Sequence, residues 1–402
     1  MWWIAFRLPM RTTLSSRSVA AVAGAAIAVG VQALASQQGG GASSVGRPAG
    51  VTVVQDAVRT ATQAAAVRYW TQARMAAALR VAAGGPAATN PTTTYLGVAV
   101  PSAGKERSVV KESLRPERRV VKQAPAEPWL TGDTGGYGLR WTHGGAVTAA
   151  VGKIFFTLDG EDYVCSGALV GGKHPDVVLT AAHCVTGGTA AANTGHGGSG
   201  KAGRPRWATN WLFVPDFSDG QLPYGEYTAR RFFIMPDWTG PQGGSEQYDV
   251  AFVQVTTATL YGGSGAAQPP PGLPVEFADG HYAAPLSRAY VFGYPSEPPY
   301  TGLYPNYCAG PATTASGGSV QIPCGMTAGD SGGPWLAGFS PLSGTGPVVA
   351  VSTYKVSDNL RVLYGAVLGP QAHALYDQAV SLARLSAGPV RSPYWSDRPP
   401  SA

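Results

Sequence analysis

Between about residue 150 and residue 352, apolar residues occur in short runs that are rich in Val, Ile, Tyr and Phe and are bounded by Gly, Pro and Ser. Short runs of this kind between turn-forming residues are typical of buried β-strands. The predicted strands are 154–157, 163–170, 177–180, 250–255, 290–292 and 348–352. Because many short strands follow one another without intervening helices, the pattern favours an all-β barrel or sandwich.

Apolar residues recur at helical spacing in two other stretches, 51–81 and 371–385. The second stretch predicts one packed C-terminal helix, followed by a flexible tail over 387–402 that is rich in Pro and Ser. The first stretch follows a Gly/Ser-rich linker, and we expect it to form a small helical pro-segment within residues 36–135.

The N-terminus has the pattern of a secretory signal peptide over residues 1–35. Three arginines precede an apolar run over 19–34, which ends in an A-x-A cleavage pattern at Ala33 and Ala35. The alternative is an uncleaved membrane anchor, although the run is short and interrupted by Gly and Gln. We therefore expect a secreted protein that is not bound to a membrane after signal cleavage.

Composition and charge narrow the possible classes. The chain has 402 residues with 54 Gly and 33 Pro, and only 13% are charged, which excludes charge-driven disorder and a long coiled coil. Its net charge of +6 comes from residues 1–130, because residues 131–402 hold 14 basic and 18 acidic side chains. We predict no nucleic-acid partner for the main body. The basic stretch around Arg118 and Arg119 is either a solvated linker or a processing region.

Three residues stand in surroundings suited to chemistry. Ser331 is flanked by glycines in the segment 329–334, so the backbone can approach a substrate closely there. His183 ends a predicted strand and precedes Cys184, a position that would hold an imidazole rigidly. Asp249 leads directly into an apolar strand, where a carboxylate needs a partner. Each has a plain structural explanation when it is considered alone.

The order His183, Asp249, Ser331, with these flanking motifs, resembles the chymotrypsin-like (trypsin-like) serine proteases over residues 145–385. The resemblance implies an all-β fold of two six-stranded antiparallel β-barrels with a C-terminal helix. We place the N-terminal barrel at 136–275 and the C-terminal barrel with its helix at 276–386. The resemblance also implies a monomer that hydrolyses a protein or peptide substrate, is associated with its own pro-segment, and uses no cofactor and no metal.

By the same resemblance, Ser331 would be the nucleophile, His183 the general base, and Asp249 the group that orients the imidazole. The backbone N–H groups of Gly329 and Ser331 would form the oxyanion hole.

Four cysteines allow three pairings. We expect Cys165 to pair with Cys184, as in the family, and Cys308 to pair with Cys324. A structural zinc site is the alternative, but no C-x-x-C spacing is present. Cys324 lies seven residues before Ser331, which looks more like the bacterial glutamyl-endopeptidase-like branch than the pancreatic enzymes.

The resemblance places the specificity pocket at Gly325, Ser352, Thr353 and Tyr354. Gly325 stands where an acidic group would select Lys or Arg, and Ser352 stands where glutamyl endopeptidases have a histidine. We therefore predict a narrowed pocket for a small or medium uncharged residue.

Asp330 raises a separate question, because in part of the family the aspartate before the nucleophile pairs with a newly formed N-terminal amine. No activation sequence of the family is evident near 120–150, and Arg288 is our candidate for a substitute cation.

Two other functions compete with the protease. The segment 329–333 also satisfies the G-x-S-x-G pattern of α/β hydrolases, for which Asp358 and His373 could complete a triad. A poor helix start after Ser331 and the absence of βαβ alternation argue against it. The non-enzymatic alternative is a protease-like binding module that has lost catalysis.

Overall fold

The computed structural model describes residues 54–82, 94–95, 98–100, 128–172, 176–188, 205–241, 245–256, 270–278, 287–356 and 359–386. The predicted signal peptide, the Arg118-Arg119 region and the C-terminal tail lie outside these residues. No helix in the described part of the chain is long and apolar enough to cross a membrane.

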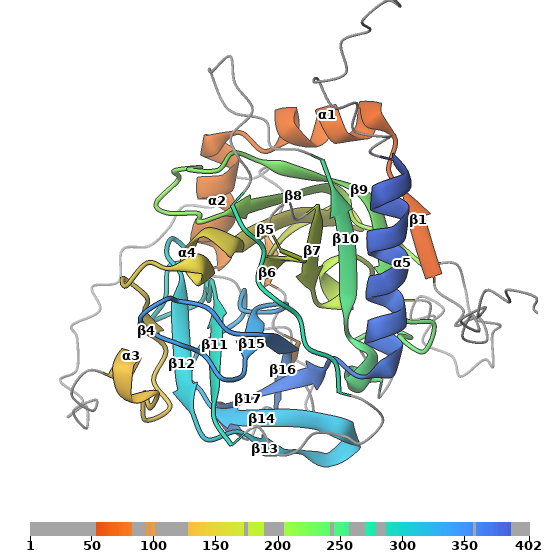
Figure 1. Ribbon diagram of the computed structural model, residues 1–402. Helices are drawn as coiled ribbons and strands as arrows, with labels where there is room; N and C mark the ends of the chain where they lie inside the picture. The colour runs from red at the N-terminus through yellow and green to blue at the C-terminus, as the bar shows by residue number, and fades with distance from the viewer. Residues whose placement is uncertain are drawn as a thin grey trace, which may run out of the picture. The chain divides into compact units, whose positions relative to one another are not determined.

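Six antiparallel strands close into the first barrel (Figure 1). The strand β8 pairs with β5 on one side and with β9 on the other, which closes the ring. Most residues of these strands are buried, as the continuous apolar runs predict. In the order around the ring they are β8 (Thr209–Pro215), β5 (Val151–Leu158), β6 (Glu161–Val170), β7 (Val177–Thr180), β10 (Ala251–Val255) and β9 (Tyr227–Ile234).

The second half of the chain forms an antiparallel sheet. Among the described residues no backbone pairing joins β12 to β14, and the disulfide between Cys308 and Cys324 links these two parts instead. The strands in spatial order are β13 (Thr313–Thr314), β14 (Ser319–Pro323), β17 (Asn359–Val367), β16 (Val348–Val356), β15 (Pro334–Leu336), β11 (Ala289–Gly293), β12 (Asn306–Gly310) and β4 (Leu139–Arg140).

The all-β class and the C-terminal helix are confirmed. Helix α5 (Pro370–Ser386) begins at a proline, which is favoured in the first turn of a helix. It buries Ala372, Leu375 and Ala379, and Gln254 of β10 donates a hydrogen bond to the carbonyl of Ala379. The short helical elements are α3 (Pro128–Thr131), α4 (Ala146–Ala150), η1 (Ala182–Cys184), η2 (Glu246–Tyr248) and η3 (Ser316–Gly318).

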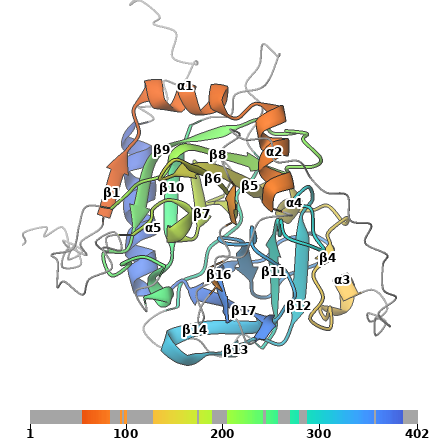
Figure 2. The ribbon, with the colours of Figure 1, turned by 180° about the vertical axis from the view of Figure 1, so that it is seen from behind.

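The predicted helical stretch near residues 51–81 forms α1 (Thr60–Tyr69) and α2 (Gln72–Ala82), and it is part of the folded core. The strand β1 (Val54–Ala57) pairs with β9, and both helices lie beside the barrel (Figure 2). Trp70 is fully buried against Phe155 and donates a hydrogen bond to the carbonyl of Asn210. The side chain of Arg74 forms a 2.8 Å ion pair with Asp162 of β6.

Two further short strands precede the protease-like region. The strand β2 (Thr94–Tyr95) pairs with β16, and β3 (Val98–Val100) pairs with β6.

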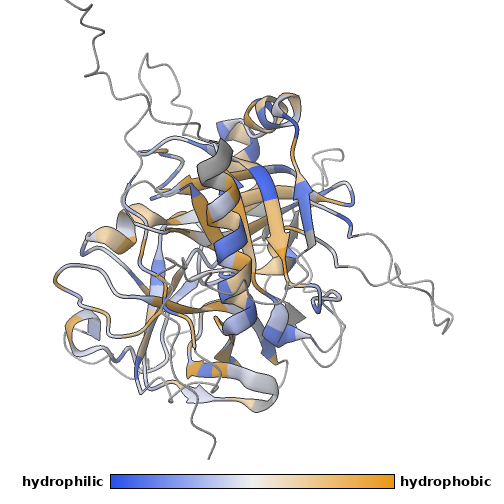
Figure 3. Ribbon diagram, turned by 45° about the vertical axis from the view of Figure 1, so that its right-hand side comes forward, coloured by the Kyte–Doolittle hydropathy of each residue, from blue (hydrophilic) through white to orange (hydrophobic). Residues whose placement is uncertain are grey.

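Hydrophobic residues are concentrated on the barrel strands, whereas α5 carries polar residues as well (Figure 3). The domain boundaries drawn from the sequence stay a prediction. Trp70, Met75, Ala78 and Leu79 share one hydrophobic cluster with the barrel.

Candidate active site

His183 and Asp249 meet because their strands are neighbours. Asp249 lies two residues before Ala251 of β10, which pairs with Thr180 of β7, and His183 follows Thr180 by three residues. The imidazole Nδ1 lies 2.7 Å from Asp249 Oδ2, and the backbone N–H of His183 donates to Oδ1 at 2.9 Å. Asp249 is fully buried, so both carboxylate oxygens are used to hold the His183 backbone and ring in place.

The predicted disulfide between Cys165 and Cys184 is present and ties η1 to β6. The two sulfur atoms lie close to a nitrogen of His183, in a cluster whose ligand atoms are all within 4.8 Å of one another. Because the sulfurs are bonded to each other, they are not thiolates, and this group does not fit the zinc alternative.

The turn that carries Ser331 packs between β6, β16 and the end of β7. Gly332 has φ +79°, and a Cβ there would lie 2.1 Å from Thr180 Oγ1, so glycine allows this close approach. The Ser331 carbonyl accepts a 2.7 Å hydrogen bond from the N–H of Ser166, and the Gly332 N–H donates to the Ser352 carbonyl at 2.7 Å. Ser331 therefore lies close to the strand end that leads into His183.

The hydroxyl and two amides of this turn have no partners among the described residues. Ser331 is fully buried, and its Oγ makes no hydrogen bond there. The backbone N–H groups of Gly329 and Ser331 likewise donate to no backbone acceptor in the described part of the chain. Unpartnered donors beside a buried hydroxyl are suited to stabilising negative charge on a bound carbonyl oxygen.

Sequence reasoning missed Ser166. Its Oγ donates a 2.8 Å hydrogen bond to the Gly329 carbonyl and accepts one from the N–H of Tyr294, so it joins the Ser331 loop to both halves of the protein. The sequence feature that could have indicated this role is the position of Ser166 directly after Cys165.

Lys153 was also missed, because a lone lysine in a strand normally reaches solvent. It is fully buried, and its Nζ donates to Ser296 Oγ at 2.7 Å and to the Tyr294 carbonyl at 3.3 Å. Burial lowers the pKa of Lys153 to about 7. Since the Ser296 N–H donates to the Ala328 carbonyl, this network supports the segment just before Gly329.

The proposed role of Arg288 as the partner of Asp330 is wrong. Arg288 donates to the backbone carbonyls of Thr131 and Gly132. The cation that acts electrostatically on Asp330 is Lys355, whose Nζ also donates to the Cys324 and Leu360 carbonyls. Burial raises the pKa of Asp330 to about 8 and lowers the pKa of Lys355 to about 8. The sequence did not reveal that Lys355 acts on Asp330, because the two residues come from different segments of the chain.

The predicted pocket residues lie on two segments beside the turn. Ser352 is fully buried, and its hydroxyl accepts a hydrogen bond from Trp335 Nε1 at 3.1 Å. The next residue, Thr353, is also buried and bonds to the Tyr364 carbonyl, while the ring of Tyr354 stacks on that of Tyr364. Gly325 is held by a 2.9 Å hydrogen bond from its N–H to the Gly136 carbonyl.

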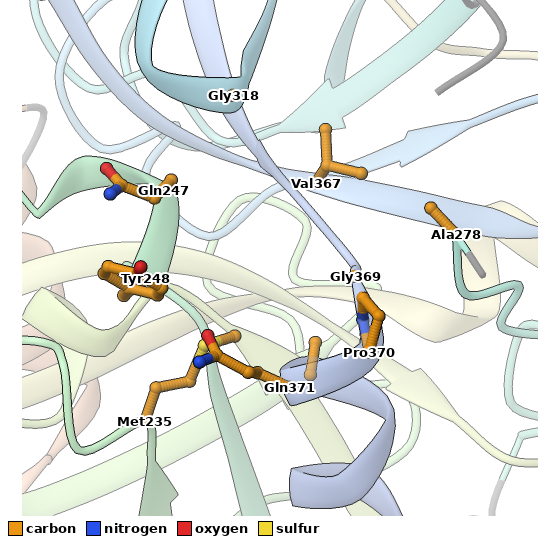
Figure 4. A pocket seen from close by; sticks show the side chains of 10 residues that line it. Met235, Gln247, Tyr248, Ala278, Gly318, Val367, Gly369, Pro370 and Gln371 are labelled. Atoms are coloured by element: carbon orange, nitrogen blue, oxygen red, sulfur yellow. The ribbon is translucent and has the colours of Figure 1, made fainter. Parts of the chain in front are cut away.

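A separate cavity of about 240 Å³ lies where η2, the end of β17 and the start of α5 meet (Figure 4). Its lining includes Met235, Tyr248, Gly318 and Gln371, and none of the predicted site residues. It is therefore distinct from the Ser331 site.

The α/β-hydrolase alternative is wrong. Such an enzyme needs a strand before the serine and a helix after it, whereas here irregular chain precedes Ser331 and strand β15 follows it. His373 lies on α5, where its ring stacks on Phe277. Asp358 lies outside the described residues.

Comparison with known proteins gives a match to a family model over part of the chain. Residues 165–338 match the family model of the trypsin-like peptidase domain. No curated protein sequence matches the chain.

Three solved structures are among those similar to this chain. The protease Anisep from Arthrobacter nicotinovorans is 33% identical over 59% of this chain and 97% of that chain, with a TM-score of 0.48. The thermostable serine protease AL20 from an extremophilic microorganism is 26% identical over 59% of this chain and 99% of that chain, with a TM-score of 0.49. A Glu endopeptidase in complex with MPD is 16% identical over 59% and 91%, with a TM-score of 0.39. The family-model match contains all three predicted site residues, so residues 165–338 of this chain form a trypsin-like peptidase domain.

Proposed function

We propose that the protein is a serine endopeptidase that cleaves peptide bonds through Ser331, His183 and Asp249. The observation that carries the proposal is the hydrogen-bonded pair of His183 and the buried Asp249, placed beside the turn that holds the Ser331 hydroxyl. In this reaction Ser331 Oγ attacks the substrate carbonyl, and His183 takes the hydroxyl proton and later gives it to the leaving amine. Water then hydrolyses the acyl-enzyme.

The remaining residues of the site support charge stabilisation and orientation. The N–H groups of Gly329 and Ser331 would stabilise the oxyanion, and each such donor contributes about 3 kcal/mol to transition-state stabilisation. Asp249 would keep the imidazole in the tautomer that accepts the serine proton and would stabilise its charged form. No step of this chemistry requires a metal or an organic cofactor.

Substrate, location and assembly are part of the same proposal. We expect a protein or peptide substrate with a small or medium uncharged residue before the cleaved bond, since Gly325 leaves no charge at the predicted pocket base. The A-x-A pattern at Ala35 and the two disulfides support secretion of a monomer after signal cleavage. Cleavage of a mixed peptide library would contradict the predicted specificity if acidic or basic residues dominated before the cut.

The function is tested by labelling with a fluorophosphonate, which reacts with activated serine hydroxyl groups. We expect label on Ser331, identified by mass spectrometry, and no label in Ser331→Ala. Absence of label in the folded chain, even after prolonged reaction, would favour the inactive binding module instead.

A further inference from the structure

Two strand edges beside Ser331 are available for a peptide. On β16, strand β17 occupies one edge, and β15 pairs with the other edge only as far as Val351. On β6, strand β5 occupies one edge, and β7 pairs with the other edge only from Ala168 onward. An extended peptide adds to such an edge as an extra strand, held by its main-chain hydrogen bonds.

The chain itself occupies both edges. Tyr95 of β2 is paired antiparallel with Tyr354 of β16, in the part of the edge that β15 leaves open. Val98 of β3 is paired antiparallel with Val164 of β6, in the part that β7 leaves open. These two strands follow each other along the chain, so one segment, residues 94–100, spans from the second sheet to the barrel.

The Ser331 turn lies between these two points of attachment. It is hydrogen-bonded to Ser352, two residues before Tyr354 on β16, and to Ser166, two residues after Val164 on β6. Two residues of a strand extend about 7 Å. Tyr95 and Val98 are three residues apart, and so little chain reaches at most about 11 Å. The two paired points, Tyr95 and Val98, therefore lie close together on either side of the serine turn.

We propose that residues 94–100 are an intramolecular peptide ligand of the active site, bound along β16 and β6 as an extended substrate would be, and that the full-length chain is self-inhibited by them. The inference rests on the proposed protease function. The part of the segment before the crossing lies where the acyl portion of a substrate would bind, and the part after it lies where the leaving portion would bind.

The preceding helices, α1 and α2, anchor residues 94–100 to the barrel. Trp70 and the ion pair between Arg74 and Asp162 dock the helices on the barrel next to β6. A segment tethered in this way acts at a high effective concentration, of millimolar order for short linkers, and so competes strongly with a free substrate.

The test compares rates of fluorophosphonate labelling of Ser331 in three chains that begin at residue 36. They are the unaltered chain, a variant in which residues 94–100 are replaced by seven Gly and Ser residues, and a control with the same replacement at residues 106–112. The replacement keeps the chain length but lowers its tendency to form strands. Intact-mass measurement establishes that each chain is uncut when it is labelled.

We expect the 94–100 variant to label at least tenfold faster than the unaltered chain, and the control to label at the unaltered rate. Equal rates in all three chains would overturn the self-inhibition while leaving the protease proposal intact. Absence of label in every folded chain, including the 94–100 variant, would overturn the protease proposal itself.

A second measurement does not depend on how the variant folds. In the Ser331→Ala chain, hydrogen–deuterium exchange should show protected amides in residues 94–100, since paired amides exchange only when the pairing opens. Exchange of this segment at the rate of an unstructured peptide would overturn the proposal. A synthetic peptide of residues 92–102, added to the 94–100 variant, should slow its labelling competitively, and failure to do so at millimolar concentration would likewise count against the proposal.

Discussion

At the scale of single residues, the site is surrounded by buried ionisable groups that each contact the backbone of a functional loop. Asp249 holds the His183 turn, Lys153 supports the segment before Gly329 through Ser296, and Lys355 contacts the Cys324 carbonyl. Buried charged groups are costly unless they are hydrogen-bonded, so these contacts make the loops depend on a few side chains.

Replacing Asp249 with Asn tests the role of its charge. Asparagine keeps the size of the side chain but cannot stabilise a charged imidazole, and its amide favours the wrong tautomer of His183. We expect the rate of fluorophosphonate labelling, measured in the 94–100 variant, to fall about 10³-fold or more. Asp237→Asn is the matched control, because this exposed carboxylate contacts only the Gln371 amide among the described side chains and its loss should change little. Similar rates in both variants would remove Asp249 from the mechanism.

The raised pKa of Asp330 predicts how the free energy of unfolding depends on pH. Burial raises its pKa from 3.8 in the unfolded chain to about 8, so the folded chain holds an extra proton between these values. This stabilising contribution is complete below about pH 4 and is lost as the pH rises through about 8, with a slope of at most about 1.4 kcal/mol per pH unit. Lys355 acts in the opposite sense above about pH 8, where the unfolded chain holds more protons because the folded pKa is lowered.

The measurement is urea unfolding across this pH range in a Ser331→Ala background, with and without Asp330→Asn. The neutral amide should make the decline in stability between about pH 4 and about pH 8 shallower, and the part that remains comes from other buried carboxyl groups such as Glu226, whose pKa burial raises to about 7. Parallel pH profiles for the two chains would show that Asp330 does not carry a raised pKa.

At the scale of elements, the fold places the three predicted catalytic residues through strand neighbours and strand ends. The pairing of β7 with β10 brings His183 to Asp249, and the close contact of Gly332 with β7 brings the serine turn to the same point. Each disulfide links two elements that strand pairing does not join. One links β6 to η1, and the other links β12 to the end of β14.

The two disulfides should contribute similarly to stability and differently to activity. They separate their cysteines by 19 and 16 residues, and closing a loop of this size stabilises a fold by about 3 kcal/mol. Replacing either pair with Ala should therefore lower the free energy of unfolding by about that amount. Only loss of Cys165 and Cys184 should also slow the labelling of Ser331, because Cys184 adjoins His183. Equal slowing in both variants would contradict this division.

Trp70 tests whether α1 belongs to the stable fold. Its indole is fully buried and packs on Phe155, so Trp70→Ala should lower the free energy of unfolding by about 3 to 5 kcal/mol. Leu342→Ala serves as the control, because Leu342 is 83% exposed and should change stability by less than about 0.5 kcal/mol. Urea unfolding in the Ser331→Ala background measures both. An unchanged midpoint for Trp70→Ala would mean that the N-terminal helices do not contribute to the core.

At the scale of the whole molecule, residues 54–100 complete the protease-like body. They add β1 to the barrel sheet, two helices beside the barrel and one strand to each half of the site. The basic stretch that follows contains many cleavage points for a trypsin-type enzyme, so the chain can be cut after this segment.

Limited proteolysis within residues 101–127 of the Ser331→Ala chain should therefore leave two fragments that remain associated. The buried Trp70, the ion pair to Asp162 and three stretches of strand pairing all act across the cut. We expect the fragments to co-elute on size-exclusion chromatography and to separate in denaturant. Elution of the N-terminal fragment alone under native conditions would contradict the described packing.

The amino-acid sequence by itself determined the strand runs, the C-terminal helix and the order of His183, Asp249 and Ser331, because strands, turns and motifs depend on local patterns. The catalytic roles of these three residues stay predictions that labelling tests. The disulfide partners followed only with the family resemblance, since four cysteines allow three pairings. The tertiary structure alone decided that Lys355 rather than Arg288 acts on Asp330, that Ser166 holds Gly329 across 163 residues of chain, and that residues 94–95 and 98–100 pair beside Ser331. Such contacts depend on which strands become neighbours and where each strand edge is left open, and that is settled by the packing of the whole chain rather than by any local pattern.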